Sequence, residues 1–305
     1  MRKYKCILDC DPGHDDALNI MLAGKASNLD VIGITTVSGN QTIEKVTNNA
    51  LQIIDYLGLD IKVYEGESHP LKKEVKACPE IHGESGLEGF HYQEIKRAKE
   101  TKDAISFIIE TLLTNKDVIL IPTGPLTNIA KAILKEPKIK QNIKKIVLMG
   151  GSIGNGNITP YAEFNILSDP EAASVVFSSG VAIDMLGLDV TRKCLIDEGT
   201  IDEFTLTDTT GTRLFKDLMV PFLKNQREFF GLTGAPLHDP LTLASLIDPS
   251  IVTFKKAKVK VHTDNDIYNG KTTVEFNDSS NIRVAVDVDV KKYFSLLKEY
   301  LIKYK

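Results

Sequence analysis

The chain has 305 residues, 42% of them hydrophobic and 26% charged, a composition that is ordinary for a soluble globular protein and excludes a disordered or collagen-like chain. The chain has 37 lysines and arginines and 41 aspartates and glutamates, which gives a net charge of −4. It therefore lacks the surplus of basic residues that is typical of a nucleic-acid binder. The four cysteines, Cys6, Cys10, Cys78 and Cys194, form no CxxC pair and indicate neither a zinc site nor a disulfide framework.

The first residues hold only a short apolar run before Asp9, which is too short for a signal peptide. No apolar stretch approaches the roughly 18 residues of a membrane span. We therefore expect a cytoplasmic protein that binds neither membrane nor nucleic acid.

Short apolar runs alternate with helical patterns along the first 190 residues. Strands are predicted at 5–10, 31–37, 61–64, 118–121, 146–149 and 182–186, and helices at 15–26, 46–57, 105–113, 126–134 and 170–177. This alternation predicts an α/β fold with an open, mostly parallel, Rossmann-like sheet flanked by helices. The runs are apolar throughout, as expected of strands buried on both faces.

After residue 191 the pattern is helical to about residue 247. Strands at 258–262, 272–276 and 283–288 and a terminal helix follow. We see no linker and no repeat, so residues 1–305 are predicted to form a single domain with a helical insertion in the C-terminal half.

Polar or glycine-rich segments follow four of the predicted strands. Ligands of an open parallel sheet bind beyond the carboxyl ends of its strands, so these segments together predict one cleft. They are residues 11–16, 38–40, 122–125 and 150–152, the last leading into a polar loop with Asn157, Glu163 and Asn165.

The segment after the first strand is the most informative, because Asp9, Asp11, Asp15 and Asp16 place four carboxylates at one turn. Capping of the following helix explains one or two of them. Four like charges this close repel one another unless a cation is present. The cluster therefore favours a divalent metal, and oxygen ligands favour Ca²⁺ or Mg²⁺ over zinc.

Other polar residues are weaker signals when taken alone. Asp239, which precedes Pro240, is typical of a helix N-cap. Loop asparagines usually serve turns, although several around one cleft suit a polyhydroxylated ligand such as a sugar. His14, His69, His91 and His262 lack a motif, so structural or surface roles are expected for them.

Residues 9–16, DCDPGHDD, resemble the DxDPGxDD signature of the inosine–uridine-type nucleoside hydrolases. Further segments match that family in order and spacing and span most of the chain, and the combination is far more specific than any one of them. They are 38–40 (SGN), 123–128 (TGPLTN), 149–151 (MGG), 163–165 (EFN) and 238–240 (HDP).

The resemblance implies hydrolysis of the N-glycosidic bond of ribonucleosides to base and ribose, with a bound Ca²⁺. It implies that Asp11 is both a Ca²⁺ ligand and the general base, with Asp16, Asp239 and the backbone carbonyl of Thr123 as further ligands. The implied ribose contacts are Asp15, Asn40 and Asn165 at the 2′- and 3′-hydroxyls, Glu163 and Asn157 near the 5′-hydroxyl, and Met149. The implied base contacts are His82, Gln226, Phe230 and His238.

Cleavage passes through an oxocarbenium-like cation, and the departing base needs a proton or a hydrogen bond. We expect His238, as a histidine with a pKa near neutrality, to supply it. Phe222 and Phe230 stand where relatives carry base-contacting tyrosines, so base preference is open. His82, Gln226 and His238 favour a uridine-capable enzyme with pyrimidine or broad preference. Relatives are commonly homodimers or homotetramers.

Two alternatives remain at this point. Asp-x-Asp after a first strand also occurs in haloacid-dehalogenase-type phosphatases, but those have Thr or Val where this chain has Gly13. The other is a non-catalytic nucleoside- or ribose-binding protein, against which the intact Asp11, Asp15, Asp16 and Asp239 argue.

Overall fold

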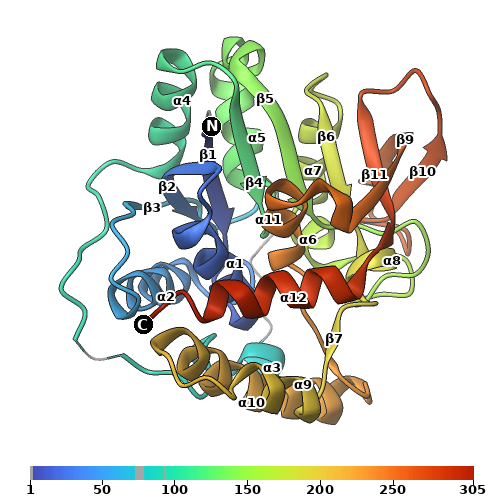
Figure 1. Ribbon diagram of the computed structural model, residues 1–305. Helices are drawn as coiled ribbons and strands as arrows, with labels where there is room; N and C mark the ends of the chain where they lie inside the picture. Colours follow the sequence, from blue (N-terminus) through green and yellow to red (C-terminus); the bar gives the residue numbers. More distant parts are fainter. Residues whose placement is uncertain (1–2, 73–78, 93) are drawn as a thin grey trace.

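Figure 1 shows the computed structural model, which describes residues 3–72, 79–92 and 94–305. Cys78 lies outside the described residues. The strands of the main sheet are β1 (Tyr4–Cys10), β2 (Leu29–Thr36), β3 (Val63–Glu65), β4 (Val118–Pro122), β5 (Ile143–Met149), β6 (Ile183–Leu186), β9 (Val252–Val261), β10 (Thr272–Phe276) and β11 (Ile282–Val288).

In the described part of the chain these strands form one sheet in the order β10-β9-β11-β6-β5-β4-β1-β2-β3. The pairs from β3 to β11 are parallel, and β9 and β10 add antiparallel strands at one edge. The order 3-2-1-4-5-6 within it is that of a Rossmann sheet, so the predicted fold class is confirmed. Strand order reverses between β1 and β4, which is where such sheets bind ligands.

Helices cover both faces of the sheet (Figure 1). They are α1 (His14–Lys25), α2 (Ile43–Tyr56), α3 (Pro79–His82), α4 (Ala104–Thr114), α5 (Thr127–Lys135), α6 (Phe164–Ser168), α7 (Pro170–Phe177), α8 (Leu188–Thr191), α9 (Glu198–Phe204), α10 (Thr210–Phe230), α11 (Pro240–Ile247) and α12 (Val290–Leu301), with short 3₁₀ turns at Pro137–Asn142 and Pro249–Ile251.

Two hydrophobic clusters lie on opposite faces of the sheet. In β1, Cys6, Leu8 and Cys10 belong to the cluster that includes α1, α2, α10 and α12, whereas Ile7 belongs to the one that includes α4, α5 and α7. Successive side chains of a strand point to opposite faces, so both faces of β1 are buried. This explains why the strand sequences are apolar throughout.

The C-terminal half contains the predicted helical insertion, formed by α9 and α10. Figure 1 shows these two helices together with α3 at one end of the molecule. The sequence prediction of uninterrupted helix was wrong in detail, because β7 (Leu195–Ile196) pairs with β8 (Ala235–Pro236) at the two ends of the insertion. A strand of two residues is too short to show the alternation of apolar and polar residues by which strands are predicted from sequence.

The strand predicted at 258–262 is also longer than expected, since β9 begins at Val252. Lys255 and Lys256 lie exposed within it and obscure its apolar pattern. None of the helices among the described residues has the length and apolar character needed to span a membrane.

Candidate active site

Asp11 lies in the short connection from β1 to α1 and is fully buried. The backbone N–H of Asn40 donates to Asp11 Oδ2 over 2.7 Å, and the Asn40 side chain donates to the Asp11 carbonyl over 3.1 Å. Gly124 packs so closely on the other side that a Cβ there would lie 2.6 Å from Asp11 Oδ1. Among the described residues, Oδ1 has no hydrogen-bond partner. A buried carboxylate oxygen without a donor suggests a site for a cation or a water.

Asp15, Asp16 and Asp239 form a buried carboxylate cluster, with ligand atoms that all lie within 4.8 Å of one another. Burial raises the pKa of Asp16 to about 7, with a further contribution from the charge of Asp15. Burial, followed by the charges of Asp15, Asp16 and Asp11, also raises the pKa of Asp239. Such a cluster can hold a metal ion, which would offset this repulsion.

Two neighbours orient the cluster. The Thr123 hydroxyl donates to Asp16 Oδ1 over 2.7 Å, and the backbone N–H of His238 donates to Asp15 Oδ2 over 3.2 Å. The structure thus brings together the ends of β1, β4 and the loop before α11. Asp15, predicted as a ribose contact, lies in the tight cluster, whereas Asp11, predicted as a ligand, lies beside it.

Asp9 does not join this group, although it shares the signature. Its Oδ1 accepts hydrogen bonds from the Thr35 hydroxyl (2.6 Å) and the Asn128 side chain (2.7 Å) inside the sheet. Burial raises the Asp9 pKa to about 6. Asn128 also donates to the Thr36 carbonyl, so Asp9 and Asn128 tie β1, β2 and α5 together.

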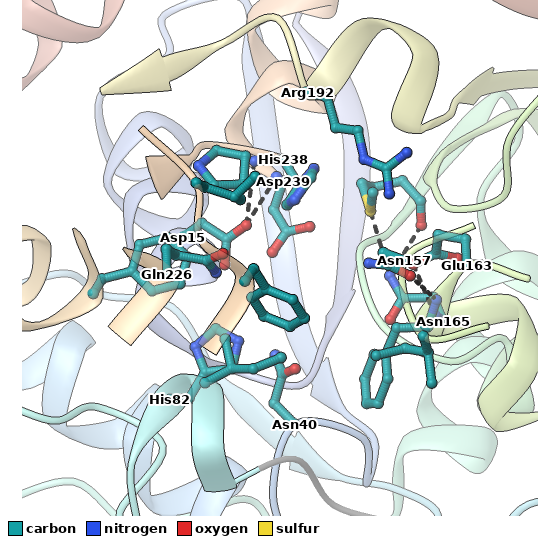
Figure 2. A pocket seen from close by; sticks show the side chains of 18 of the residues that line it. Asp15, Asn40, His82, Asn157, Glu163, Asn165, Arg192, Gln226, His238 and Asp239 are labelled. Carbon is teal, nitrogen blue, oxygen red and sulfur yellow. Dashed lines mark hydrogen bonds between the residues drawn. The ribbon is translucent and has the colours of Figure 1, made fainter. Parts of the chain in front are cut away.

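A cavity of about 340 Å³, within the size range of small-molecule sites, opens next to the cluster. Figure 2 shows the carboxylates and His238 on one side of it and Asn157, Glu163 and Asn165 on the other. Asp11 and Asp16 are fully buried and do not line it. Every other predicted site residue does: Asp15, Asn40, His82, Thr123, Met149, Asn157, Glu163, Asn165, Gln226, Phe230, His238 and Asp239.

The polar side of the cavity is held by the start of α6. Glu163 caps this helix and accepts backbone N–H bonds from Gly151 (2.9 Å), Asn165 (2.8 Å) and Ile166 (3.1 Å). The Asn165 side chain donates to the carbonyls of Thr123 (2.8 Å) and Met149 (3.2 Å). These bonds fix the amide and carboxylate groups before any ligand arrives.

The other side carries histidines and aromatic rings from α3, α10 and the loop before α11. His82 stacks on Phe222 with ring centroids 5.5 Å apart, and His14 stacks on both rings. His14 is fully buried, with Nδ1 3.0 Å from His82 Nδ1 and Nε2 3.0 Å from the Glu88 carbonyl. His14 thus has the structural role expected for it.

His238 is held by Thr191, whose hydroxyl lies 2.7 Å from His238 Nδ1. Burial, followed by the positive charge of Arg192, lowers the pKa of His238 to about 3. The prediction of a pKa near neutrality was therefore wrong, because the residue is partly buried in the cavity wall and lies near the Arg192 cation. At neutral pH the ring is uncharged, and Nε2 is the nitrogen left to contact a ligand.

Arg192 lines the cavity and was missed by sequence reasoning, as were Ile81, Ile158, Phe164, Leu195, Leu232 and Pro236. Arg192 lies six residues beyond the carboxyl end of β6, which is not among the four strand ends considered in the sequence analysis. The strand-end rule, applied after Leu186, finds it. The apolar members carry no sequence signal that separates them from core residues.

Residues 6–295 match the family described as inosine-uridine preferring nucleoside hydrolase. The chain belongs to this family. The predicted enzyme class, a ribonucleoside hydrolase, is confirmed, and the phosphatase and non-catalytic alternatives are not supported.

Relatives of this nucleoside hydrolase differ in the substrates that their names state. Pyrimidine-specific ribonucleoside hydrolase RihB of Escherichia coli K12 is 40% identical over 98% of this chain and 97% of its own. The purine-preferring ribonucleoside hydrolase from Gardnerella vaginalis is 35% identical with a TM-score of 0.90, over 97% of this chain and 99% of its own. A plant nucleoside hydrolase, PpNRh1, is 31% identical with a TM-score of 0.91, over 98% of both chains.

Proposed function

We propose that this enzyme hydrolyses the N-glycosidic bond of ribonucleosides to free base and ribose and accepts uridine, with a pyrimidine or broad preference. The observation that carries the proposal is one cavity with a buried carboxylate cluster at one wall and fixed amide and carboxylate groups at the other. That division suits a nucleoside whose reacting bond lies beside the cluster and whose ribose reaches from the cluster to the opposite wall.

We propose Ca²⁺ as the metal, held by Asp11, Asp16, Asp239 and the Thr123 carbonyl. The donor set fits, since it consists of oxygens alone, and Asp11 Oδ1 is buried without a hydrogen-bond partner among the described residues. When bound, the ion would add positive charge at the cluster and lower the pKa of a water there. Asp15 is close enough to Asp16 and Asp239 to be a further candidate ligand.

Asp11 is proposed as the general base, acting through Oδ1. Oδ2 accepts the N–H of Asn40, whereas Oδ1 has no donor among the described residues and has two lone pairs, so it can face the ion with one and accept a proton from water with the other. Burial, followed by the charge of Asp16, raises the Asp11 pKa, and a higher pKa makes the carboxylate a stronger base once it is ionised.

Ribose is proposed to bind through Asp15, Asn40 and Asn165 at the 2′- and 3′-hydroxyls and through Asn157 and Glu163 near the 5′-hydroxyl, with Met149 against the ring. Glu163 is buried and supported by three backbone donors, so it is positioned without the substrate. Such anchoring lets contacts remote from the bond assist its cleavage.

The departing base is proposed to receive a hydrogen bond from uncharged His238. With Nδ1 next to the Thr191 hydroxyl, His238 can present Nε2–H to the base. Phe222 and Phe230 lack a hydroxyl, so neither can take part in a proton relay. His82 and Gln226 remain as polar contacts for a pyrimidine edge.

Release of ribose from uridine, cytidine and inosine, measured with Ca²⁺ present, tests the proposal. We expect kcat/KM for uridine to equal or exceed that for inosine. No ribose from any of the three would refute the activity, and turnover of inosine alone would refute the preference.

We further propose that residues 1–305 form one domain, because a continuous sheet joins β1 to β11. The free, buried Cys6, Cys10 and Cys194 support a reducing compartment such as the cytoplasm. A homodimer or homotetramer stays a prediction that light scattering decides.

A further inference from the structure

The short helix α8 lies between the two halves of the cavity and contacts both. It follows β6 and is extended by Arg192 at its C-cap. One of its side chains, Thr191, holds His238, as described above. Two others, Asp189 and Arg192, bind the loop that leads to Asn157 and Glu163.

Asp189 and Arg192 bind four consecutive residues of that loop. The Asp189 carboxylate accepts the backbone N–H of Ile153 (2.6 Å) and of Gly154 (3.0 Å). The Arg192 guanidinium donates to the carbonyls of Asn155 (3.2 Å) and Gly156 (2.6 Å). Hydrogen bonds to charged groups are stronger than neutral ones, and four of them act on one segment whose first three residues are exposed.

The bound segment leads directly into Asn157. The backbone N–H groups of Gly156 and Asn157 donate to the carbonyls of Pro160 (3.1 Å) and Ala162 (3.2 Å), which folds residues 156–162 into a compact loop. The Asn157 side-chain oxygen accepts the Phe164 N–H over 3.0 Å. Because this bond fixes the oxygen, the amide nitrogen of Asn157 is the end that can donate to a ligand.

We propose that Asp189 and Arg192 are positioning residues for the 5′-hydroxyl of the nucleoside, acting through Asn157. This inference rests on the proposed function, since it needs a ribose in the cavity. Residues 153–155 are exposed, and one further hydrogen bond reaches them, from the Ser152 hydroxyl to the Gly154 carbonyl over 3.3 Å. The α8 contacts therefore supply most of the hydrogen bonds that place residues 153–156, and through Gly156 they act on the position of Asn157 relative to Glu163.

A role through the 5′-hydroxyl differs from a general structural role in what it predicts for a substrate without that group. We compare kcat/KM for uridine and 5′-deoxyuridine in wild type, Asp189→Ala and Arg192→Ala. The ratio of the two values should fall by about 5- to 10-fold in each variant, the range of one lost hydrogen bond. Most of the change should be a slower reaction of uridine, because 5′-deoxyuridine never made the contact. Dividing by the 5′-deoxyuridine value also cancels any effect of Arg192 on His238.

The matched control is Lys193→Ala, which removes the next side chain. Lys193 pairs with Asp287 and, among the described residues, makes no hydrogen bond to the loop, so the ratio in this variant should equal that of wild type. Arg192→Lys keeps the charge but not the two-pronged geometry, and it should resemble Arg192→Ala.

Hydrogen exchange gives a readout that needs no turnover. The backbone amides of Ile153 and Gly154 should exchange faster in Asp189→Ala than in wild type. In Lys193→Ala their exchange rates should equal those of wild type. If exchange is faster but the ratio of kcat/KM for uridine to that for 5′-deoxyuridine is unchanged, the inference is overturned while the proposed function stands. The same holds if neither the exchange rate nor this ratio changes. A wild-type enzyme that releases no ribose from any nucleoside would overturn the proposed function instead.

Discussion

Replacement of Gly124 by alanine is the sharpest test of how Asp11 is positioned. Gly124 has no positive φ, so alanine can adopt its backbone conformation and only the added methyl group matters. That methyl would lie 2.6 Å from Asp11 Oδ1, 2.9 Å from Asp11 Cγ and 3.0 Å from a methyl group of Val37. An ordinary contact begins at 3.4 Å, so the carboxylate oxygen must move by about 0.8 Å if the backbone stays in place.

A displacement of this size is costly for a catalytic group. A misplacement of about 1 Å can reduce a rate by about 100-fold, and we expect a fall in kcat for uridine of that order in Gly124→Ala. Overpacking of a filled site typically costs about 1–3 kcal/mol, so the variant should still fold. Ribose release at saturating uridine gives kcat, thermal unfolding gives the stability, and Ca²⁺ titration separates metal loss from a misplaced base.

Gly199→Ala is the matched control. Gly199 lies in α9, and a Cβ there would meet only Asp197 Oδ1 at an ordinary 3.5 Å. Its kcat should equal that of wild type. If Gly124→Ala retains kcat within about threefold at full Ca²⁺ occupancy, the close packing on Asp11 has no catalytic importance and our reasoning about that residue is wrong.

Three further predictions follow from other parts of the molecule. Ca²⁺ at about 100 times its Kd should raise the free energy of unfolding of wild type by about 2.7 kcal/mol and leave that of Asp239→Asn unchanged. If Ca²⁺ raises the melting temperatures of the two proteins equally, Asp239 is not a ligand of the metal. Thr191→Val should lower kcat about tenfold for uridine and 5′-deoxyuridine alike, by freeing the His238 ring; an effect on one substrate only would contradict this. Asp184→Asn should cost about 2 kcal/mol at pH 7, because Asp184 accepts two hydrogen bonds of 2.7 Å from Arg283. That pairing holds the Asp184 pKa below its ordinary 3.8, so its contribution to stability is present above pH 3.8. The difference in the free energy of unfolding between wild type and variant, measured with urea, should therefore narrow as the pH falls below 3.8. A difference that stays constant with pH would show that the charge is unimportant.

Much of the fold follows from local pattern. The strands at the centre of the sheet and the helices between them are predicted because each is a contiguous run whose period or apolar character is visible locally. The sequence does not predict the short strands β7 and β8 or the lysine-rich start of β9, because they form by pairing with strands that are distant in sequence.

The site residues divide in the same way. The spacing of Asp9, Asp11, Asp15 and Asp16 at one strand-to-helix turn is local, so a metal site there was predicted from the repulsion of these four charges. That Asp9 turns into the sheet toward Asn128 could not be predicted, because it depends on which side of β1 faces α5. The lowered pKa of His238 likewise depends on burial by residues that are distant in sequence and on the nearby charge of Arg192.

The sequence by itself determined the α/β class, the strand ends that carry polar groups, and the family resemblance with the residues it implied. Only the tertiary structure brought the Asp239 backbone to Asp15 across 224 residues, gathered the carboxylates within one metal's reach, and connected α8 to both walls of the cavity. The physical reason is that a motif records local geometry, whereas distances between strand ends depend on the order in which the strands pair.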